Sequence, residues 1–382
     1  MRFVIVGPAY PIRGGIAQSV TQLYKTLCGS GHDVHVLSFK RLYPNFLFPG
    51  TTQFESGKPL YKLRSKAILD SINPLTWIHA LIWLQTIRPT TLIFQYWMPF
   101  FVPCYVFLTV LAKIFWGVQV LYICHNIIPH EQRIGDSFFS KLGLKFVDGF
   151  ITQSLSVHQD LLTIRPDAKI IDVPHPVYTI LPDAIPKQEA RNKLGIQAEH
   201  IILYFGIIRP YKGVKYLVQA MPEILKHKQV QCFICGEFYE ERDETIHLIR
   251  DLNLEANITV QDQFIPNETI HLYFCAADLV VLPYVTATQS GVVQVAYNYN
   301  RPVLVTDVGG LPEVVQDGHT GYVVPPKNPD AISKAVLHFF RNTRKIPFEK
   351  NIKSEKSKYS WEQMGEAVVT LAQKQCGHSK KA

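Results

Sequence analysis

The stretch VYTILPDAIPKQ, residues 177–188, divides this 382-residue chain into two parts. It carries two prolines and follows neither a helical nor a strand period, which is typical of a linker. On each side of it, short apolar runs alternate with segments of helical period. This alternation favours parallel sheets whose strands are joined by right-handed helical crossovers. We therefore expect an α/β protein of two domains, residues 1–177 and 178–358.

The expected strands are short apolar runs with a helical segment after most of them. In the first domain they are RFVIVGP (2–8), HDVHVLSF (32–39), TLIFQYW (91–97), VQVLYICHN (118–126), GFITQS (149–154) and KIIDVPHP (169–176). In the second they are HIILYFGII (200–208), VQCFICGEF (230–238), NITVQDQF (257–264), LVVLPY (279–284) and RPVLVTDVG (301–309). Each series predicts a Rossmann-like, doubly wound sheet that binds ligands at the carboxyl ends of its strands. We expect a long loop over residues 40–73 and a last helix, 360–376, packed back on the first domain.

Composition and charge narrow the class of protein. The chain is 47% hydrophobic and 18% charged, which favours a sizeable core over disorder. Its seven scattered cysteines and the absence of a basic segment before the first apolar run predict a cytoplasmic protein without a secretory signal. Residues 1–176 contain 16 basic and 9 acidic residues, so +7 of the net charge of +8 lies there. A basic, aromatic half suits an anionic membrane face or a phosphate-bearing ligand better than nucleic acid, for which no motif is present.

One segment raises the question of a membrane. The run WMPFFVPCYVFLTVLAKIFWGVQVLYIC, residues 97–124, is very apolar. Two prolines and Lys113 interrupt it, and Gly117 separates a helix-like part from a strand-like part. We expect a buried helix followed by a core strand, with a membrane-dipping helix as the alternative.

Two glycine-containing loops are candidate anion sites. In GPAYPIRGGIAQSV (7–20), Gly14 and Gly15 open a helix after a strand, and the N–H groups of such a helix start suit a phosphate. A plain structural turn is the alternative. In YFGIIRPYKGVKYL (204–217), a strand ends at Gly206, and Arg209 and Lys212 precede the next helix. Two cations there can clamp a diphosphate, or they can be solvated charges of a loop.

The second loop also carries a family resemblance. The pattern G-x-x-R-x-x-K-G over residues 206–213 resembles the donor-phosphate motif of the family-4 glycosyltransferases, which have the GT-B fold. The stretch RPVLVTDVGGLPEVVQDGHTGYVV (301–324) is similar to the closing block of that family, and the resemblance spans essentially the whole chain. It implies two Rossmann-like domains facing across a cleft, with a nucleotide diphosphate-sugar on the second and an acceptor on the first.

The resemblance also implies a reaction. A sugar passes to an acceptor hydroxyl with retention of anomeric configuration, and no metal or other cofactor takes part. Arg209 and Lys212 would neutralise the leaving diphosphate. His125, at the end of a predicted strand, stands where the family has a histidine near the donor sugar, although a satisfied structural histidine is the alternative. Glu131 follows in a loop and is a candidate for contact with the acceptor.

The chain departs from the family at one place. The family usually carries two glutamates eight positions apart, which contact the sugar and the ribose, and these positions are Ala287 and Val295 here. We expect neutral groups to replace them. Residues 288–291 and the helix that follows offer side-chain hydrogen bonds to sugar hydroxyls and backbone N–H groups to the distal phosphate. The candidate donor-binding residues of this stretch are Thr288, Gln289, Ser290, Gly291 and Val292, with Glu313 as a weaker one.

The sequence thus predicts a retaining, metal-independent hexosyltransferase of cell-envelope polysaccharide or glycolipid synthesis. Its partners would be a nucleotide-sugar, a glycan or lipid-linked acceptor and the anionic inner membrane face, without nucleic acid. A binding or scaffold protein that kept the fold but lost catalysis is the first alternative, because the two acids are missing. A sugar-nucleotide epimerase of related fold is the second.

Overall fold

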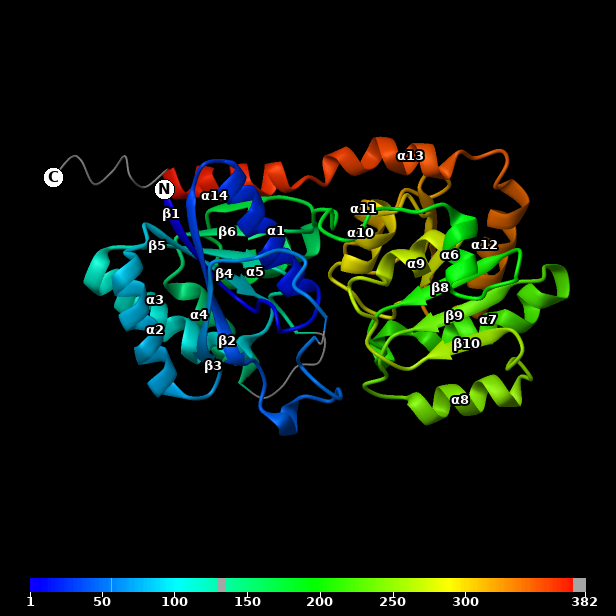
Figure 1. Cartoon of the computed structure of the whole chain (residues 1–382), viewed down its shortest axis with the longest axis horizontal. Coiled ribbons are helices and arrows are strands. Elements are labelled where there is room, and N and C mark those ends of the chain that lie inside the picture. The colour runs from blue at the N-terminus through cyan, green and yellow to red at the C-terminus, as the bar shows by residue number, and fades with distance from the viewer. Residues whose placement is uncertain (56, 130–134, 374–382) are drawn as a thin grey trace. The chain divides into compact units, whose positions relative to one another are not determined.

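The computed structural model describes residues 1–55, 57–129 and 135–373, and Glu131 therefore lies outside the described residues. The chain divides into two compact units. Unit 1 comprises Met1–Pro176 and Tyr359–Ala382, and unit 2 comprises Val177–Lys358 (Figure 1). The division falls one residue before the expected boundary. Each unit is an α/β structure around one parallel sheet, as the alternating pattern predicts.

The sheet of unit 1 has seven parallel strands in the order β3-β2-β1-β4-β5-β6-β7. The strands are β1 (Arg2–Val6), β2 (Asp33–Arg41), β3 (Ser65–Asp70), β4 (Thr91–Tyr96), β5 (Gln119–Cys124), β6 (Gly149–Thr152) and β7 (Ile170–Asp172). The chain starts in the centre of the sheet, so the order reverses beside β1, where ligands of such sheets bind.

The expectation of a loop over residues 40–73 was wrong. Strand β3 and the 3₁₀ turn η1 (Asn45–Leu47) lie inside it. Strand β3 is an edge strand that pairs only with β2, and of its six residues only Leu69 is buried. Because edge strands are only partly covered, they lack the continuous apolar run by which the other strands are recognised.

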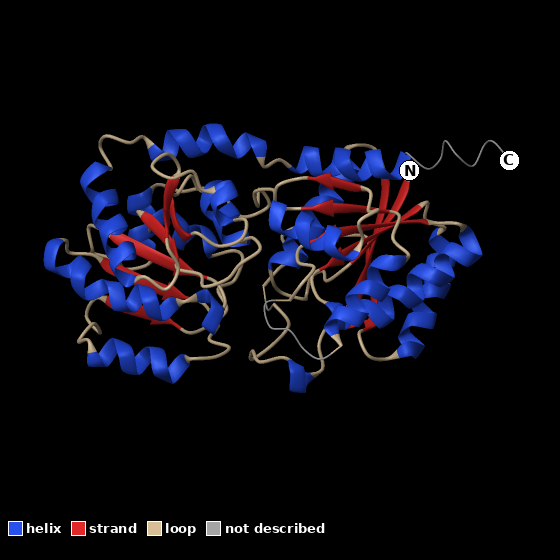
Figure 2. Cartoon of the chain, turned by 180° about the vertical axis from the view of Figure 1, so that it is seen from behind, coloured by secondary structure: helices blue, strands red, loops and turns tan. Residues whose placement is uncertain are grey.

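Helices cover both faces of this sheet (Figure 2). Helices α1 (Gly15–Gly29) and α14 (Trp361–Gln373) share one core with one set of strand side chains. The other face is covered by α2 (Pro74–Ile87), α3 (Val102–Trp116), α4 (Asp136–Lys145) and α5 (Leu155–Ile164), and the turn η2 (Pro99–Phe101) leads into α3. The last helix therefore packs on α1, within unit 1.

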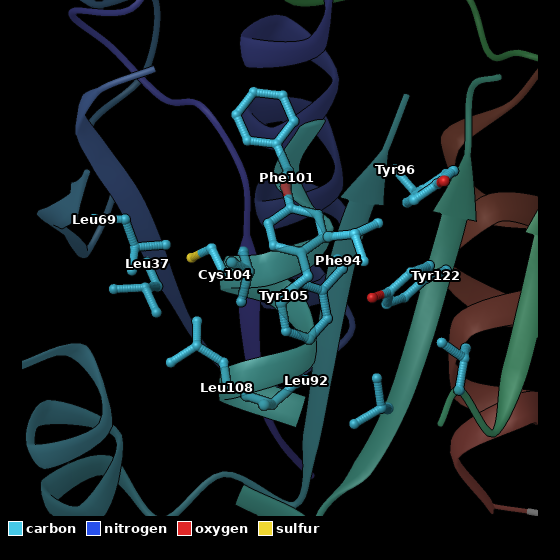
Figure 3. Close-up of a cluster of buried hydrophobic side chains, with 14 of the residues drawn as sticks. Leu37, Leu69, Leu92, Phe94, Tyr96, Phe101, Cys104, Tyr105, Leu108 and Tyr122 are labelled. Carbon is cyan, nitrogen blue, oxygen red and sulfur yellow. The ribbon is translucent and has the colours of Figure 1, made fainter. Parts of the chain in front are cut away.

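Helix α3 packs along one side on the core of unit 1. Within the described residues, Pro99–Trp116 is the one helical segment that is long and apolar enough to cross a membrane, on length and composition alone. Its inner residues Cys104, Tyr105 and Leu108 are fully buried and face Phe94 and Tyr122 of the sheet (Figure 3). The core strand β5 follows directly, as expected, and α3 is buried along its inner side, whereas Ile114 and Phe115 near its end are exposed.

The sheet of unit 2 has six parallel strands in the order β10-β9-β8-β11-β12-β13. The strands are β8 (Ile201–Phe205), β9 (Gln231–Cys235), β10 (Ile258–Gln261), β11 (Leu279–Leu282), β12 (Val303–Thr306) and β13 (Gly321–Val324). The helices are α6 (Lys187–Lys193), α7 (Val214–His227), α8 (Arg242–Asp251), α9 (Ile270–Ala276), α10 (Gly291–Asn298), α11 (Leu311–Val314), α12 (Pro329–Asn342) and α13 (Phe348–Glu355), with the 3₁₀ turns η3 (Pro210–Lys212) and η4 (Lys356–Lys358).

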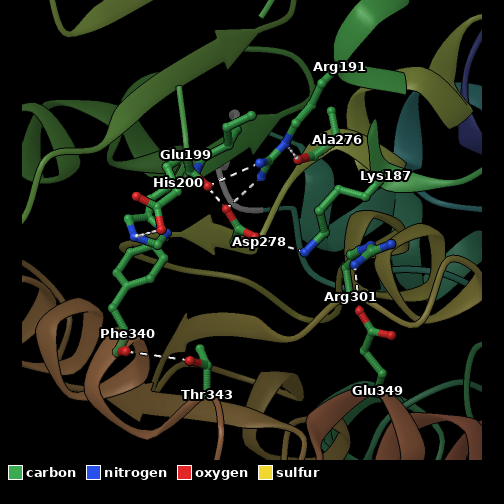
Figure 4. Close-up of polar contacts among 11 residues, drawn as sticks. Lys187, Arg191, Glu199, His200, Ala276, Asp278, Arg301, Phe340, Thr343 and Glu349 are labelled. Carbon is green, nitrogen blue, oxygen red and sulfur yellow. Dashed lines mark hydrogen bonds and ion pairs between the residues drawn. The ribbon is translucent and has the colours of Figure 1, made fainter. Parts of the chain in front are cut away.

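The largely covered carboxylate of Asp278 ties the first helix of unit 2 to the sheet (Figure 4). Asp278 accepts hydrogen bonds from Lys187 Nζ at 2.8 Å and from Arg191 Nη2 at 2.9 Å. The backbone N–H of Ile201 also donates to Asp278, at 2.7 Å. Because Asp278 and Arg191 are both almost covered, each charge needs the other to offset its lost hydration. This network fixes α6 against the starts of β8 and β11.

Candidate active-site residues

Helix α1 of unit 1 opens at the carboxyl edge of the sheet. Its N-cap is Gly14, with φ of 116°, a conformation that favours glycine over residues with a side chain. A Cβ at Gly14 would meet nothing within 4 Å, so the space beside it is open. The N-cap glycine offers no side-chain cap, and no acid lies in the first turn of the helix, whose dipole favours negative charge at this end. Gly14 and Gly15 thus lie where an anion can approach the backbone.

Four polar residues gather at the carboxyl ends of the next strands. His125 follows β5 directly, and its Nε2 lies 2.6 Å from Oε1 of Gln95 on β4. Gln153 follows β6 and hydrogen-bonds the His125 ring. His175 follows β7, with its ring centroid 6.4 Å from that of His125. All four side chains are buried, which is unusual for polar groups unless they are bonded to one another.

The surroundings keep both histidines neutral. Burial, with a smaller contribution from the charge of His175, lowers the pKa of His125 to about 3, and the hydrogen bond with Gln153 opposes this only in part. Burial likewise lowers the pKa of His175 to about 4, against the hydrogen bond to the carbonyl of Pro176. An amide oxygen only accepts, so His125 donates to Gln95 in the tautomer that carries the ring proton on Nε2. At neutral pH His125 is therefore a hydrogen-bonding group and not a cation.

In unit 2, a glycine brings the cationic loop against the next strand. Gly213 has φ of 65°, and a Cβ there would lie 2.1 Å from the carbonyl oxygen of Pro283. The close approach places Lys212 Nζ 3.8 Å from the ring centroid of Tyr284, which follows β11. Arg209, three residues earlier, lies over the ring of Tyr239 at 5.3 Å. The two cations are thus held by aromatic faces.

Lys212 has an unusual environment for a lysine. Its side chain is half-buried, and within the described residues no carboxylate forms an ion pair with it. Burial, together with the nearby charge of Arg209, lowers its pKa, which Tyr211 opposes. A covered ammonium without an acid costs free energy that an anionic ligand would offset.

The loop after β11 lies against the cationic loop. A Cβ at Gly206 would be 3.4 Å from Cγ2 of Val292, in the first turn of α10. The N-cap of α10 is Ser290, whose Oγ lies 3.3 Å from the hydroxyl of Tyr284. Tyr284 therefore contacts Lys212 with its ring and Ser290 with its hydroxyl. Neither a side-chain cap nor an acid occurs at the start of α10.

The closing block holds this loop in place. Gly309 has φ of 49°, and a Cβ there would lie 1.7 Å from the carbonyl oxygen of Ala287. The backbone N–H of Gly310 donates to the carbonyl of Thr288 at 2.9 Å. Gln289 and Gly291 follow in the same loop. Glu313 lies in the first turn of the short helix α11 and is exposed.

At Ala287 and Val295, where the family usually carries glutamates, the structure places no other acid in their stead among the residues of this loop. Ala287 is half-buried and Val295 lies in the core, on the inner side of α10. Among the described residues of unit 2, Glu237 is the one buried acid. It lies two residues after the end of β9, and Gly236 between them packs on the backbone of Gly206. Glu237 is thus the carboxylate at this edge of the sheet that the sequence did not single out.

Five residues of these clusters were missed by sequence reasoning: Gln95, Gln153, His175, Glu237 and Tyr284. Each stands in or directly after an apolar strand run, which is the one signal that could have found it. Within the described residues, no group of three or more His, Cys, Asp or Glu side chains is arranged to hold a metal ion.

Comparisons with known proteins agree with this geometry. Residues 13–179 match the sequence profile of Glycosyltransferase Family 4, and residues 199–342 match that of the Glycosyl transferases group 1. The chain is 25% identical to an uncharacterized glycosyltransferase of Methanocaldococcus jannaschii, over 97% of each protein. In structure it is similar to a sucrose-phosphate synthase from Thermosynechococcus elongatus, with a TM-score of 0.76, 19% identity and coverage of 97% and 99%. It is also similar to Anabaena HepE in complex with UDP and glucose, with a TM-score of 0.72, 15% identity and coverage of 96% and 98%.

Proposed function

Because the chain belongs to the glycosyl transferases group 1 and is a glycosyltransferase of GT-B fold, we propose that it moves a hexose from a nucleotide diphosphate-sugar to an acceptor hydroxyl. The observation that carries this proposal is Lys212, a half-buried ammonium without a carboxylate partner in the described residues, beside the uncapped start of α10. The structural neighbour that holds UDP and glucose supports a nucleotide-sugar as donor.

In the proposed reaction, unit 2 holds the donor. Lys212 and Arg209 offset the charge that develops on the diphosphate as the glycosidic bond breaks. The backbone N–H groups of Gly291 and Val292, at the start of α10, bind the distal phosphate. Thr288 and Gln289 offer neutral hydrogen bonds to the sugar, in place of the acids that relatives carry.

Unit 1 takes the acceptor side in this proposal. Neutral His125 contributes a hydrogen bond to the transferring sugar, and the positive end of α1 at Gly14 offsets developing negative charge. Transfer proceeds with retention and without a metal ion or other cofactor. The acceptor is a glycan or lipid-linked glycan of the cell envelope, reached from the cytoplasmic face of the membrane.

Calorimetric titration tests the donor site. UDP, GDP, dTDP and ADP, with and without attached sugars, are titrated into the parent and into Lys212→Ala. We expect one nucleotide to bind the parent, and to bind Lys212→Ala at least tenfold more weakly, since a charge-assisted hydrogen bond is worth about 1.5–3 kcal/mol. Lys215→Ala is the matched control, because Lys215 lies three residues further on, in the first turn of α7, and pairs with Glu241 at 3.3 Å. Equal binding by Lys212→Ala and the parent would refute the donor site.

The missing acids favour one second function, a scaffold that binds a nucleotide-sugar without transferring it. Ala287 and Val295 cannot supply the contacts that acids make to the sugar and ribose. Slow hydrolysis of the bound donor to free sugar separates the two functions, because it needs cleavage but no acceptor. Donor binding with cleavage supports the transferase, and donor binding without any cleavage supports the scaffold. NMR of the anomeric proton of the transferred sugar then tests retention.

A further inference from the structure

The outer face of α2 is an apolar surface without a partner in the structure. Helix α2 contains no charged residue, and its inner side packs on the core through Trp77, Ala80 and Leu84. On the opposite side, Leu75, Ile78 and Ile82 are exposed by 67%, 45% and 56%. Their spacing of three and four residues places them on one stripe of the helix. We refer to these three residues as the α2 stripe.

Such exposure is confined to one unit. Within the described residues, every exposed large apolar side chain lies in unit 1, and unit 2 has none. Helix α3 packs beside α2, where Phe107 of α3 contacts Trp77 of α2. Near the end of α3, the side chains of Ile114 and Phe115 are exposed as well. Extended apolar surfaces of this kind mark contacts with membranes or with other proteins.

The charges around the α2 stripe favour a membrane over another protein as its partner. The sixty residues between Asp70 and Glu131 contain no acid. Arg88 directly follows α2, and Lys66 lies on β3, the strand against which α2 packs. Both are exposed, and within the described part of the chain neither has an ion pair. Two acids of neighbouring segments are paired with cations, since Asp70, at the end of β3, binds Arg41, and Asp148 binds Lys113 of α3, each at 2.6 Å.

From this pattern we propose that the α2 stripe, flanked by Arg88 and Lys66, docks on a bilayer of anionic lipids. A second copy of the chain would bring like charges together, whereas phosphate headgroups complement them. The stripe is aliphatic, unlike the aromatic cores that protein interfaces favour. The inference rests on the proposed function for its role, because a surface-bound enzyme meets lipid-linked acceptors in two dimensions.

Sedimentation with lipid vesicles tests the docking surface. The full chain is mixed with vesicles of phosphatidylcholine alone or of phosphatidylcholine with one third phosphatidylglycerol. We expect the parent to bind the anionic vesicles more tightly, and more weakly as salt is added. The double variant Leu75→Gln/Ile82→Gln should bind roughly tenfold more weakly, since burial of even half of each side chain accounts for such a factor. Arg88→Gln should weaken binding to anionic vesicles by roughly fivefold and leave neutral ones unaffected.

Leu155→Gln is the matched control. Leu155 is 59% exposed and begins α5, which packs on β6 and β7 at the sheet edge opposite β3. This variant should bind vesicles like the parent. The proposal is overturned if the parent ignores anionic vesicles, if the stripe variant binds as the parent does, or if Leu155→Gln loses as much as the stripe variant. It is also overturned if ultracentrifugation shows a dimer that only the stripe variant dissociates.

Nucleotide titration of the same proteins keeps the two proposals separable. The stripe variant should retain the parent's affinity for the nucleotide diphosphate, because α2 belongs to unit 1 and the donor residues belong to unit 2. Vesicle binding without nucleotide binding would leave the docking surface standing and remove the proposed donor site. Nucleotide binding without vesicle binding would do the reverse.

Discussion

Replacing Tyr284 by leucine tests how Lys212 is held ready for a diphosphate. The Lys212 ammonium lies 3.8 Å from the centroid of the Tyr284 ring, and Tyr284 is fully buried. A cation over an aromatic face gains about 0.5–1 kcal/mol at exposed sites and about 2 kcal/mol where water is excluded. Because this lysine is half-buried, we take about 1–2 kcal/mol for the contact, which corresponds to roughly five- to thirtyfold in an equilibrium constant.

The direction of the effect follows from geometry. The face of the Tyr284 ring attracts the ammonium of Lys212 but offers no oxygen or nitrogen acceptor. The N–H groups of the ammonium therefore stay available to a phosphate. Without the ring, the lysine side chain regains rotamers that must be lost again on binding. We therefore expect Tyr284→Leu to raise the dissociation constant of the nucleotide diphosphate by roughly five- to thirtyfold.

Tyr284→Phe separates the ring from its hydroxyl. It keeps the aromatic face and removes only the hydroxyl, which lies 3.3 Å from Ser290 Oγ. Calorimetry should find its affinity within about twofold of the parent, because the cation–π contact is unchanged. Thermal melting verifies that both variants are folded at the assay temperature, since loss of a buried ring also costs stability. Parent-like binding by Tyr284→Leu, or an equal loss in Tyr284→Phe, would refute the reasoning.

Three further predictions concern stability. The pKa of His125 is about 3 in the folded chain and ordinarily 6.5, so between these pH values the unfolded chain binds more protons. The free energy of unfolding therefore falls as pH decreases through this range, by about 1.4 kcal/mol per pH unit. Urea unfolding of His125→Gln should show a shallower dependence of this free energy on pH between pH 6 and 4, and a dependence equal to that of the parent would contradict the assignment. Gly213→Ala should lose about 2–5 kcal/mol in the same assay, because its Cβ would overlap the carbonyl of Pro283 at positive φ; a loss under about 1 kcal/mol would contradict it. Asp278→Asn should lose about 3–5 kcal/mol, since it leaves Arg191 buried without its charge partner, and a parent-like unfolding midpoint would speak against that ion pair.

The sequence predicts most of the two sheets because their strands are buried on both faces. Each of the eleven apolar runs identified from the pattern overlaps a strand of the structure. Strands β3 and β13 were missed, and both lie at sheet edges. Of the six residues of β3 only Leu69 is buried, whereas β13 is largely buried but is a run of only four residues. The sequence signal of a strand is its apolar run, which is interrupted where burial ends, as in β3, and is short in β13.

The sequence likewise predicts some residues of the candidate site and not others. Glycines and cations of a loop are visible in sequence, because their conformations and charges are local properties. The partners of His125 are not, since Gln95 and Gln153 meet it only because β4, β5 and β6 are neighbours in the sheet. Tyr284 reaches Lys212 for the same reason, as β8 and β11 are adjacent. Contacts that depend on strand order cannot be read from the spacing of residues along the chain.

The absence of acids at Ala287 and Val295 has an electrostatic consequence for Lys212. A carboxylate in this loop would share the same small region as the ammonium and would offset part of its charge. With neutral groups at Ala287 and Val295, and with an aromatic face as its contact, Lys212 has no carboxylate of this loop that competes with a phosphate for its ammonium. The same neutral loop leaves the dipole of α10 without an acid in its first turn. In the proposed donor site, neutral residues at these two positions would therefore weaken recognition of sugar and ribose and strengthen the field that stabilises a leaving diphosphate, so the missing pair is compatible with the proposed transfer.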